Sequence, residues 1–309
     1  MFQAQKALFI YCISPVHMGA STAIGLIDNP IQRERHTDYP MMAGSGLKGA
    51  ARHWQWAQLD EAERKRKENL LNRLFGPESG DGNLYAGAIS FGDAQLVAFP
   101  VRCAKRAYVY ATSPTALARA KRLLQTLGVA CDWPIPEIQE RFCRVVEDKG
   151  PVGNNQPLHL EVFELKAIDS PELAAIAQFL AEKALPADNA YAFFREKLKT
   201  DLVLLPDDDF GYFVRNATVV EPHVCIDNDT GAAKGTGLFY TENLPPESLL
   251  LAPLMATAER SGKGAMQAGE VMDAVLKGGE GLKGLNGQLV QVGGDATTGR
   301  GQVVITAVE

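Results

Sequence analysis

The sequence predicts an α+β fold, because strand-like and helix-like segments mix along the chain without a regular alternation of strand, helix and strand. Continuous apolar runs with β-branched and aromatic residues indicate buried strands, whereas apolar residues three and four positions apart indicate amphipathic helices. No internal repeat is evident in the 309 residues, a length typical of one large domain or two modest ones.

The first third of the chain contains one strand, one long connection and one helix. Ala7–Ser14 is a continuous apolar run that predicts a buried strand. The polar segment Pro15–Gly44 is far longer than an ordinary loop, and loops of that length are commonly functional. A helix is expected from Ser45, as its N-cap residue, and the charged run Asp60–Glu68 is expected to form a solvated helix face.

The remaining elements follow from the same patterns. We expect strands over Ala88–Phe99 and Ala104–Thr112, and helices over Ser113–Leu127, Pro171–Leu185 and Ala190–Lys199. Val219–Asp227 and Thr236–Glu242 flank a turn at Asn228–Gly231 and predict a β-hairpin. Two last strands, Leu289–Val292 and Gln302–Val308, enclose the glycine-rich loop Gly293–Gly301.

Composition and charge exclude several classes of protein. Apolar content of 46% and charged content of 22% are those of a globular chain. The net charge of −6 argues against coating nucleic acid by bulk charge. Charge is uneven, however: residues 31–73 carry nine Lys/Arg against six Asp/Glu, whereas residues 201–229 carry seven acids and one Arg. The N-terminal third therefore carries a local positive charge that can bind phosphate groups.

Neither a membrane span nor a disulfide framework is predicted. The uncharged stretch Ala7–Ile27 is interrupted at Pro15, and the apolar run before it is only about eight residues. The five cysteines are odd in number and widely spaced, without a C-x-x-C pair. We therefore expect a reducing, cytoplasmic setting and no membrane partner.

Gly44-Ser-Gly-Leu-Lys-Gly49 has the pattern G-x-G-x-x-G and opens the first helix. A dinucleotide fingerprint needs a strand directly before it, and Pro40 argues against one. Free N–H groups at a helix N-terminus, close to Lys48 and Arg52, nevertheless suit a phosphate. The alternative interpretation is an ordinary helix start with two surface cations.

Gly294–Gly301 approaches a P-loop pattern, but Arg300 replaces the lysine and Gly301 replaces the Ser/Thr. A strand rather than a helix follows, so nucleotide hydrolysis is not predicted. Glycines let a backbone approach a sugar–phosphate chain closely. An ordinary glycine-rich turn is the alternative.

Asp28 is the one acid between Pro15 and Gln32. A lone loop carboxylate is usually a turn residue. Near basic residues it can instead position a metal or a nucleophile at a phosphate. No Ser/His/Asp set and no paired histidine ligands accompany it, and Asp227–Gly231 fails the calcium-loop pattern and predicts an Asx-type turn.

Four strings occur in a characteristic order: His17-Met-Gly19, Asp28–Thr37 (Asp-Asn-Pro-Ile-Gln-Arg-Glu-Arg-His-Thr), Pro40–Gly49 with Arg52, and the loop Gly293–Gly301. Together they resemble the RAMP superfamily of CRISPR proteins, and within it the repeated backbone subunit of the type III-B (Cmr) effector. The second string is the most specific. The resemblance covers both ends of the chain, whereas residues 103–200 carry no matching motif.

This resemblance implies a ferredoxin-like, RRM-type palm in a single domain over residues 1–309. It implies a helical insertion over about residues 113–200 and a thumb hairpin over about residues 217–243. Copies of the chain would stack in a helical filament along a CRISPR RNA, together with other Cmr subunits. Each thumb would displace one nucleotide of the guide–target duplex.

The resemblance also implies an endoribonuclease that cuts the target RNA beside each displaced nucleotide. Asp28 would be the catalytic residue in a reaction that depends on a divalent metal, expected to be magnesium. The 2′-hydroxyl would attack, leaving a 2′,3′-cyclic phosphate. His17 is either an acid near the leaving oxygen or a structural residue, and Glu242 is a weaker candidate for a second acid.

The RNA-binding residues implied by the resemblance are His17, Gly19, Ser45, Lys48, Arg52, Gly293, Gly294, Gly299, Arg300 and Gly301. Three alternatives stay open. The chain is a non-catalytic scaffold that binds CRISPR RNA, the related type III-A (Csm) backbone subunit, or an enzyme acting on a small phosphate compound.

Overall fold

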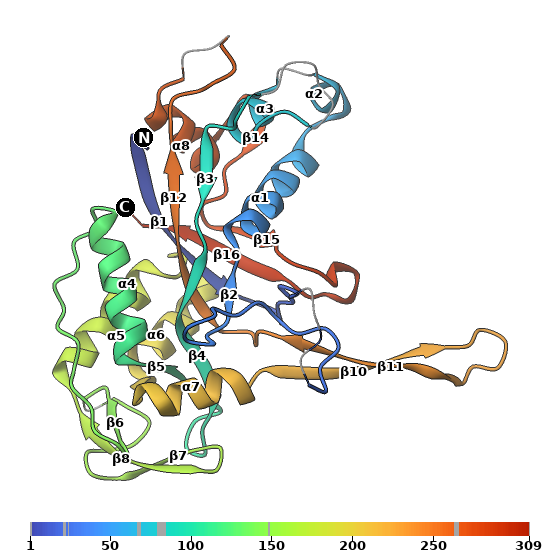
Figure 1. Ribbon diagram of the computed structural model, residues 1–309. Coiled ribbons are helices and arrows are strands. Elements are labelled where there is room, and N and C mark those ends of the chain that lie inside the picture. The colour runs from blue at the N-terminus through green and yellow to red at the C-terminus, as the bar shows by residue number, and fades with distance from the viewer. Residues whose placement is uncertain are drawn as a thin grey trace.

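Four antiparallel strands form the centre of the molecule, in the order β16-β1-β12-β4 (Figure 1). Helix α1 lies between β1 and β4 along the chain, and helix α8 lies between β12 and β16. This is the ferredoxin-like split βαβ arrangement, and it confirms the α+β prediction. The bounds are β1 Ala4–Cys12, β4 Ala94–Arg102, β12 Leu249–Ala256, β16 Gln302–Ala307, α1 Gly44–Gln58 and α8 Ala268–Lys277.

The computed structural model describes residues 2–20, 23, 25–66, 69–78, 85–147, 149–262 and 266–308. Within these residues the central strands belong to a 12-stranded sheet. Beyond β16 lies β15 (Gln288–Gln291), and the other side continues through β5 (Tyr108–Thr112), β9 (Leu202–Leu204), β6 (Phe142–Val145), β8 (Phe163–Asp169) and β7 (Pro157–Leu160). Two short strands complete it: β2 (Met41–Met42) pairs with β4, and β3 (Ile89–Phe91) pairs with β12.

Helices cover both faces of this sheet, which explains why β1 is continuously apolar and buried from Ala7 to Cys12 rather than alternating. Leu8 and Ile10 point to the face covered by α1 and α8. Phe9 and Tyr11 point to the opposite face, which α4 (Pro114–Thr126) and α5 (Pro171–Lys183) cover. Each such side chain contributes about 1.5–3 kcal/mol by leaving water.

The segment expected as a helical insertion, about residues 113–200, is mixed rather than only helical. It contains α4, α5, the 3₁₀ turn η1 (Asn189–Tyr191) and α6 (Ala192–Thr200). It also contributes β6, β7 and β8, which join the main sheet. These strands alternate between buried and exposed positions near the sheet edge, so they lack the continuous apolar run on which the prediction relied.

Several expected boundaries shift. Ala88–Phe99 is divided into β3 and β4, and β5 begins at Tyr108 because residues 104–107 form a turn. Of the charged run Asp60–Glu68, α2 (Glu61–Lys65) is helical and residues 67 and 68 lie outside the described residues. The remaining small elements are α3 (Leu70–Phe75), α7 (Asp207–Asn216), β13 (Gly278–Gly279), β14 (Leu282–Lys283) and η2 (Ala296–Thr298).

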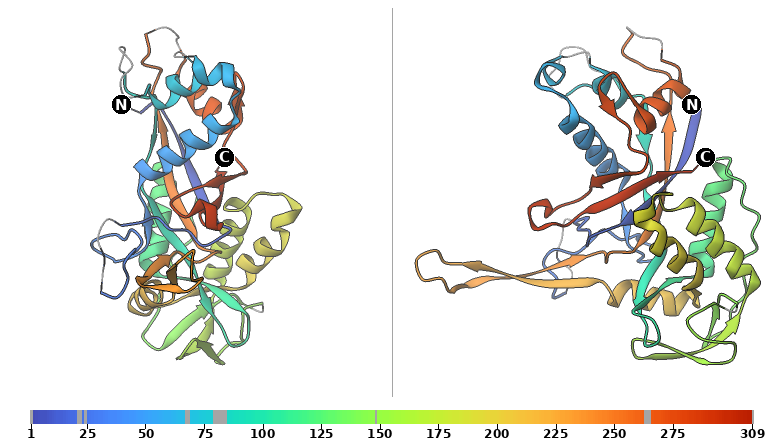
Figure 2. Two further views of the ribbon diagram at one scale, coloured as in Figure 1. Left: turned by 90° about the vertical axis from the view of Figure 1, so that its right-hand side faces the viewer. Right: turned by 180° about the vertical axis from the view of Figure 1, so that it is seen from behind.

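The predicted hairpin projects from the body as a two-stranded ribbon (Figures 1 and 2). Its strands are β10 (Val219–Ile226) and β11 (Ala233–Asn243), paired from Val219 opposite Asn243 to Ile226 opposite Ala233. At the tip, Oδ1 of Asp227 accepts the backbone N–H groups of Asp229 and Thr230, both at 3.1 Å. The tip is therefore the Asx-type turn that the sequence predicts. We call this hairpin the thumb.

No helix in the described part of the chain has the length and apolarity needed to cross a membrane.

Candidate nucleic-acid interface

Asp28 lies on the surface where the long first loop meets the thumb. Its Oδ2 accepts the backbone N–H of Tyr240 at 2.8 Å. The next residue, Asn29, bridges to Thr241 and exchanges backbone hydrogen bonds with β11 on both sides: its N–H donates to the Tyr240 carbonyl at 3.0 Å, and its carbonyl accepts from the Glu242 N–H at 2.9 Å. The loop is thus laid along the root of the thumb, and the exposed Asp28 carboxylate faces solvent there.

Glu242 is the anchor of this junction rather than an accessible acid. Its side chain is buried, and its Oε2 accepts the backbone N–H of Ile31 at 3.0 Å. Its Oε1 accepts Arg33 Nη2 at 2.6 Å and the Thr218 hydroxyl at 2.9 Å. Because both oxygens are occupied, the structure does not support Glu242 as a second catalytic acid.

Most of the specific string Asp28–Thr37 serves to hold the loop. Arg33 Nη1 also donates to the carbonyls of Asp38 and Val214, at 2.9 and 3.0 Å. Gln32 donates to the Gly19 carbonyl at 3.1 Å and accepts the Ala43 N–H at 3.0 Å, which ties the loop to the start of α1. Glu34 pairs with both terminal nitrogens of Arg119 from α4, and this pairing lowers the pKa of Glu34 against the effect of its burial, which raises it.

His17 connects the thumb root to the C-terminal glycine loop. Its Nδ1 lies 2.7 Å from the Glu242 carbonyl oxygen, so the neutral ring carries its proton on Nδ1. Its own carbonyl accepts the N–H of Gly294 at 2.9 Å. A Cβ atom on Gly19 would lie 2.9 Å from His17 Nε2, so this glycine makes room for the imidazole. These contacts favour the structural interpretation of His17.

The glycines of Gly293–Gly301 divide into two kinds. Gly293 and Gly301 have φ of +82°, and a Cβ at either would clash with a carbonyl oxygen, of His17 and Val292 respectively. Gly294 and Gly299 are exposed, so they leave bare backbone at the surface. Arg300 is less available than expected, because Nη2 pairs with Glu221 of β10 at 2.5 Å.

The start of α1 differs from the expectation in one respect. The N-cap residue is Ala43, so Ser45 lies inside the first turn, exposed and without a capping bond. The Gly44 N–H donates to Asp93 Oδ1 at 2.7 Å. The N–H groups of Ser45 and Gly46 precede the first intrahelical hydrogen bond and are directed out of the helix end.

Met18 brings the start of α1 and the glycine loop together. A Cβ on Gly46 would lie 2.8 Å from Met18 Cε, and one on Gly293 would lie 3.3 Å from Met18 Sδ. The residue before it, His17, contacts the thumb root. Three segments that are far apart in the sequence, near residues 17–19, 44–49 and 293–301, therefore form one continuous surface with Asp28 beside it. We call this the thumb-root surface.

Lys48 and Arg52 extend the thumb-root surface along α1. Burial lowers the pKa of the half-buried Lys48, and the positive charges of Arg260 and Arg52 lower it further. Arg52 Nη2 donates to Asn72 Oδ1 at 2.9 Å, and Nη1 lies 3.6 Å from a Glu78 oxygen. Arg260 was missed by the sequence analysis, which had no local signal to connect it with residues 48 and 52.

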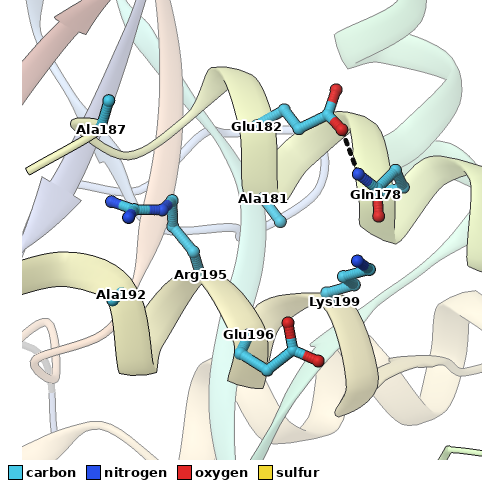
Figure 3. Close-up of a pocket in the computed structure, with 8 residues that line it drawn as sticks. All are labelled: Gln178, Ala181, Glu182, Ala187, Ala192, Arg195, Glu196 and Lys199. Carbon is cyan, nitrogen blue, oxygen red and sulfur yellow. Dashed lines mark hydrogen bonds between the residues drawn. The ribbon is translucent and has the colours of Figure 1, made fainter. Parts of the chain in front are cut away.

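A separate pocket of about 440 Å³ lies between α5 and α6 (Figure 3). Its charged side chains are mixed in sign, with Arg195 and Lys199 beside Glu182 and Glu196. Arg195 is already bonded to the carbonyls of Pro186 and Asp188. None of the predicted site residues lines it, so the candidate site is an open surface rather than this pocket.

The described residues bring together no group of three or more His, Cys, Asp and Glu side chains able to hold a metal ion. Among these residues Asp28 therefore stands at this site as a single carboxylate.

The model of the RAMP superfamily matches residues 9–304. The CRISPR system Cmr endoribonuclease Cmr4 of Pyrococcus furiosus is 32% identical over 301 residues, covering 97% of this chain and 94% of the relative. The crystal structure of oligomeric Cmr4 from the same organism covers 99% of this chain and 98% of its own, with a TM-score of 0.71 and 28% identity. A type III-B Cmr-beta complex bound to cognate target RNA contains a chain with the same fold, with a TM-score of 0.71 and 17% identity over 99% of this chain and 98% of its own.

Proposed function

The chain belongs to the RAMP superfamily, and on that premise we propose that it is the repeated backbone subunit of a type III-B CRISPR effector and an endoribonuclease. It binds CRISPR RNA along the thumb-root surface and cuts complementary target RNA at regular intervals. The observation that carries this proposal is the position of Asp28: its carboxylate is exposed at the root of the thumb, 2.8 Å from the Tyr240 nitrogen. The thumb, which would displace a nucleotide, and the Asp28 carboxylate, which would act on the RNA, therefore lie next to each other.

The guide strand is held by its backbone. The free N–H groups of Ser45 and Gly46, the cations Lys48 and Arg52, and the bare backbone at Gly294 and Gly299 all suit phosphate and sugar. The close approaches of the backbone in this surface require glycine at positions 19, 293 and 301. His17 links the thumb root to the glycine loop, and Arg300 links that loop to the thumb by pairing with Glu221. Contacts of this kind are independent of base identity, as a variable guide requires.

Cleavage uses the nucleophile that RNA carries. When the thumb displaces one target nucleotide, the ribose 2′-oxygen can align with the phosphorus and the departing 5′-oxygen, which a continuous A-form helix prevents. Asp28 orients the 2′-hydroxyl and accepts its proton as the bond from oxygen to phosphorus forms. The bond from phosphorus to the 5′-oxygen breaks, that oxygen takes up a proton, and a 2′,3′-cyclic phosphate remains.

Among the residues that the structure describes, Asp28 is the carboxylate that would hold a magnesium ion at this site. Magnesium commonly binds through one or two carboxylates together with substrate phosphates and water, so a single exposed carboxylate beside RNA fits this demand. When bound, the ion neutralises charge on the phosphate under attack.

Copies of the chain and other Cmr subunits are the expected protein partners. The thumb exposes apolar side chains that an isolated ribbon leaves in water, among them Val224, Ile226 and Leu238, each at least 50% exposed. A two-stranded ribbon is marginally stable alone, so partners or RNA are expected to cover it. All five cysteines are among the described residues and are free thiols, which suits the reducing cytoplasm.

Replacing Asp28 by Asn tests the enzyme against the scaffold alternative. Assembled complexes should bind target RNA as before, while regularly spaced cutting disappears. Asp273→Asn, an exposed carboxylate on α8, is the matched control and should leave cutting intact. Unchanged cutting by Asp28→Asn complexes would support the scaffold. Co-purification with Csm rather than Cmr subunits would support the type III-A alternative, and binding of a mononucleotide by the isolated chain would support the small-molecule enzyme.

A further inference from the structure

Helix α3 joins two cationic segments of the chain. Asn72 accepts a hydrogen bond from Arg52 of α1 at 2.9 Å. The next residue, Arg73, donates two hydrogen bonds to the Glu259 carboxylate, at 2.9 and 2.8 Å. Arg260 follows Glu259 directly, so a short chain of contacts places it near Arg52 although the two lie more than 200 residues apart in sequence.

The backbone that carries Arg260 is held firmly. The Glu259 side chain is 1% exposed, and its pKa lies below the usual range because Arg73 pairs with it. The Ser261 hydroxyl bonds to the same carboxylate, and the Glu259 N–H donates to the Met266 carbonyl at 2.9 Å. Arg260 itself is exposed and makes no ion pair with any residue that the structure describes. The hydrogen bonds of Glu259 therefore fix the backbone beside Arg260, while its guanidinium stays unpaired with respect to the described residues.

The charges around Lys48 are unbalanced. Lys48 also forms no ion pair within the described ranges, and its charged neighbours are Arg260 and Arg52. Arg52 Nη1 lies 3.6 Å from a carboxylate oxygen of Glu78, whose side chain is 71% exposed. Like charges that gather at a half-buried lysine disfavour its charged form, and a bound anion removes that cost.

We propose that Arg260 is a third cationic contact to the guide RNA, forming with Lys48 and Arg52 a cluster that binds phosphodiester groups beside the start of α1. The inference rests on the proposed function and adds a residue from the opposite end of the chain to it. The guanidinium donates to non-bridging phosphate oxygens and reads no base. Binding there couples the loop after β12 to α1 through α3.

The test measures binding of the full chain to a single-stranded RNA of guide length at several salt concentrations. Arg260→Ala should weaken binding several-fold and make the slope of log affinity against log salt shallower by about 0.7, the value for one lost phosphate contact. Arg260→Lys should recover most of the affinity because it keeps the charge. Arg122→Ala, an exposed arginine on α4, should match the unaltered chain.

A second measurement does not need RNA. When ¹³C-methyl groups are attached to the lysine Nζ atoms, nuclear magnetic resonance can follow the titration of Lys48. The pKa of Lys48 should be higher in Arg260→Ala, because a neighbouring positive charge is gone. An unchanged salt slope, or an unchanged Lys48 pKa, would overturn the inference while leaving the proposed function intact. If the unaltered chain binds RNA with no salt dependence, the proposed function itself is wrong.

Discussion

The Asp28 carboxylate accepts the backbone N–H of Tyr240 at 2.8 Å, across 212 positions of sequence. This bond places the acid at the root of the thumb whatever the side chain at position 240. Because the Tyr240 N–H binds Oδ2 of Asp28, the orientation of the other carboxylate oxygen, Oδ1, is set by a main-chain contact rather than by a mobile side chain. The geometry of the site therefore depends on how the first loop is fastened to β11.

The Glu242 side chain makes the main contacts that hold the first loop on β11, and Glu242→Gln should weaken them. The substitution removes the charge that pairs with Arg33 and leaves a largely buried guanidinium uncompensated. Breaking a buried pair in this way costs about 3–5 kcal/mol. Denaturant unfolding should show the loss, and cutting should fall more than guide binding. Glu61→Gln breaks the exposed pair with Lys65 and should change stability by no more than about 1 kcal/mol.

Gly293→Ala should destabilise the chain and weaken guide binding, because φ is +82° and the new methyl group would clash with the His17 carbonyl. Gly49→Ala is the contrasting control. A Cβ there meets nothing within 4 Å, and alanine favours the helix interior by about 0.5–1 kcal/mol. Thermal unfolding of both variants should therefore shift in opposite directions. A stabilised Gly293→Ala would contradict the packing of the loop on His17.

Glu247 should make stability depend on pH. Burial raises the pKa of Glu247 from 4.5 to about 7. The folded state then holds a proton that the unfolded state releases above about pH 4.5, so stability falls as pH rises from there and levels off above about pH 7. The full shift corresponds to about 3 kcal/mol as an upper bound. Glu247→Gln should flatten the profile of unfolding free energy between pH 5 and 8, and an unaltered profile would assign the dependence to another group.

Lys48→Ala should weaken guide binding to a similar degree for guides of unrelated sequence, because the lysine meets phosphate rather than a base. Parallel titrations with two guides of different composition measure this. A loss confined to one guide would mean that Lys48 reads sequence.

Local pattern was sufficient for elements that a short window defines. Ala7–Ser14 predicted β1, and the turn residues around Asn228–Gly231 predicted the thumb. The central strand β12 was not among the predicted strands, and its Pro253 is untypical of a strand at the centre of a sheet. In the structure β12 pairs with β1 without interruption, with Ala7 opposite Pro253. On its other edge β12 changes neighbours around this proline, from β4 at Leu249–Leu251 to β3 at Leu254–Ala256.

The site was predictable only in part, because its contacts span the chain. The order of the motifs pointed to Asp28, Lys48 and the glycine loop. No window of sequence shows that Glu242 is enclosed by Arg33, Thr218 and Ile31, or that Arg260 lies near Lys48. Ser45 was expected as the N-cap residue of α1, but Ala43 occupies that position and makes no side-chain cap. The side chains of Gln32 and Asp93 instead accept the N–H groups of Ala43 and Gly44.

The most direct test of the central claim is a target RNA with one 2′-deoxynucleotide at a mapped cut site, incubated with assembled complexes. If the displaced ribose supplies its own nucleophile beside Asp28, that single cut disappears and the neighbouring cuts persist. Each remaining cut then leaves a 2′,3′-cyclic phosphate on its 5′ fragment and a 5′-hydroxyl on its 3′ fragment. Continued cutting at the deoxy linkage would mean that another nucleophile attacks, and the assignment of Asp28 to the 2′-hydroxyl would be wrong.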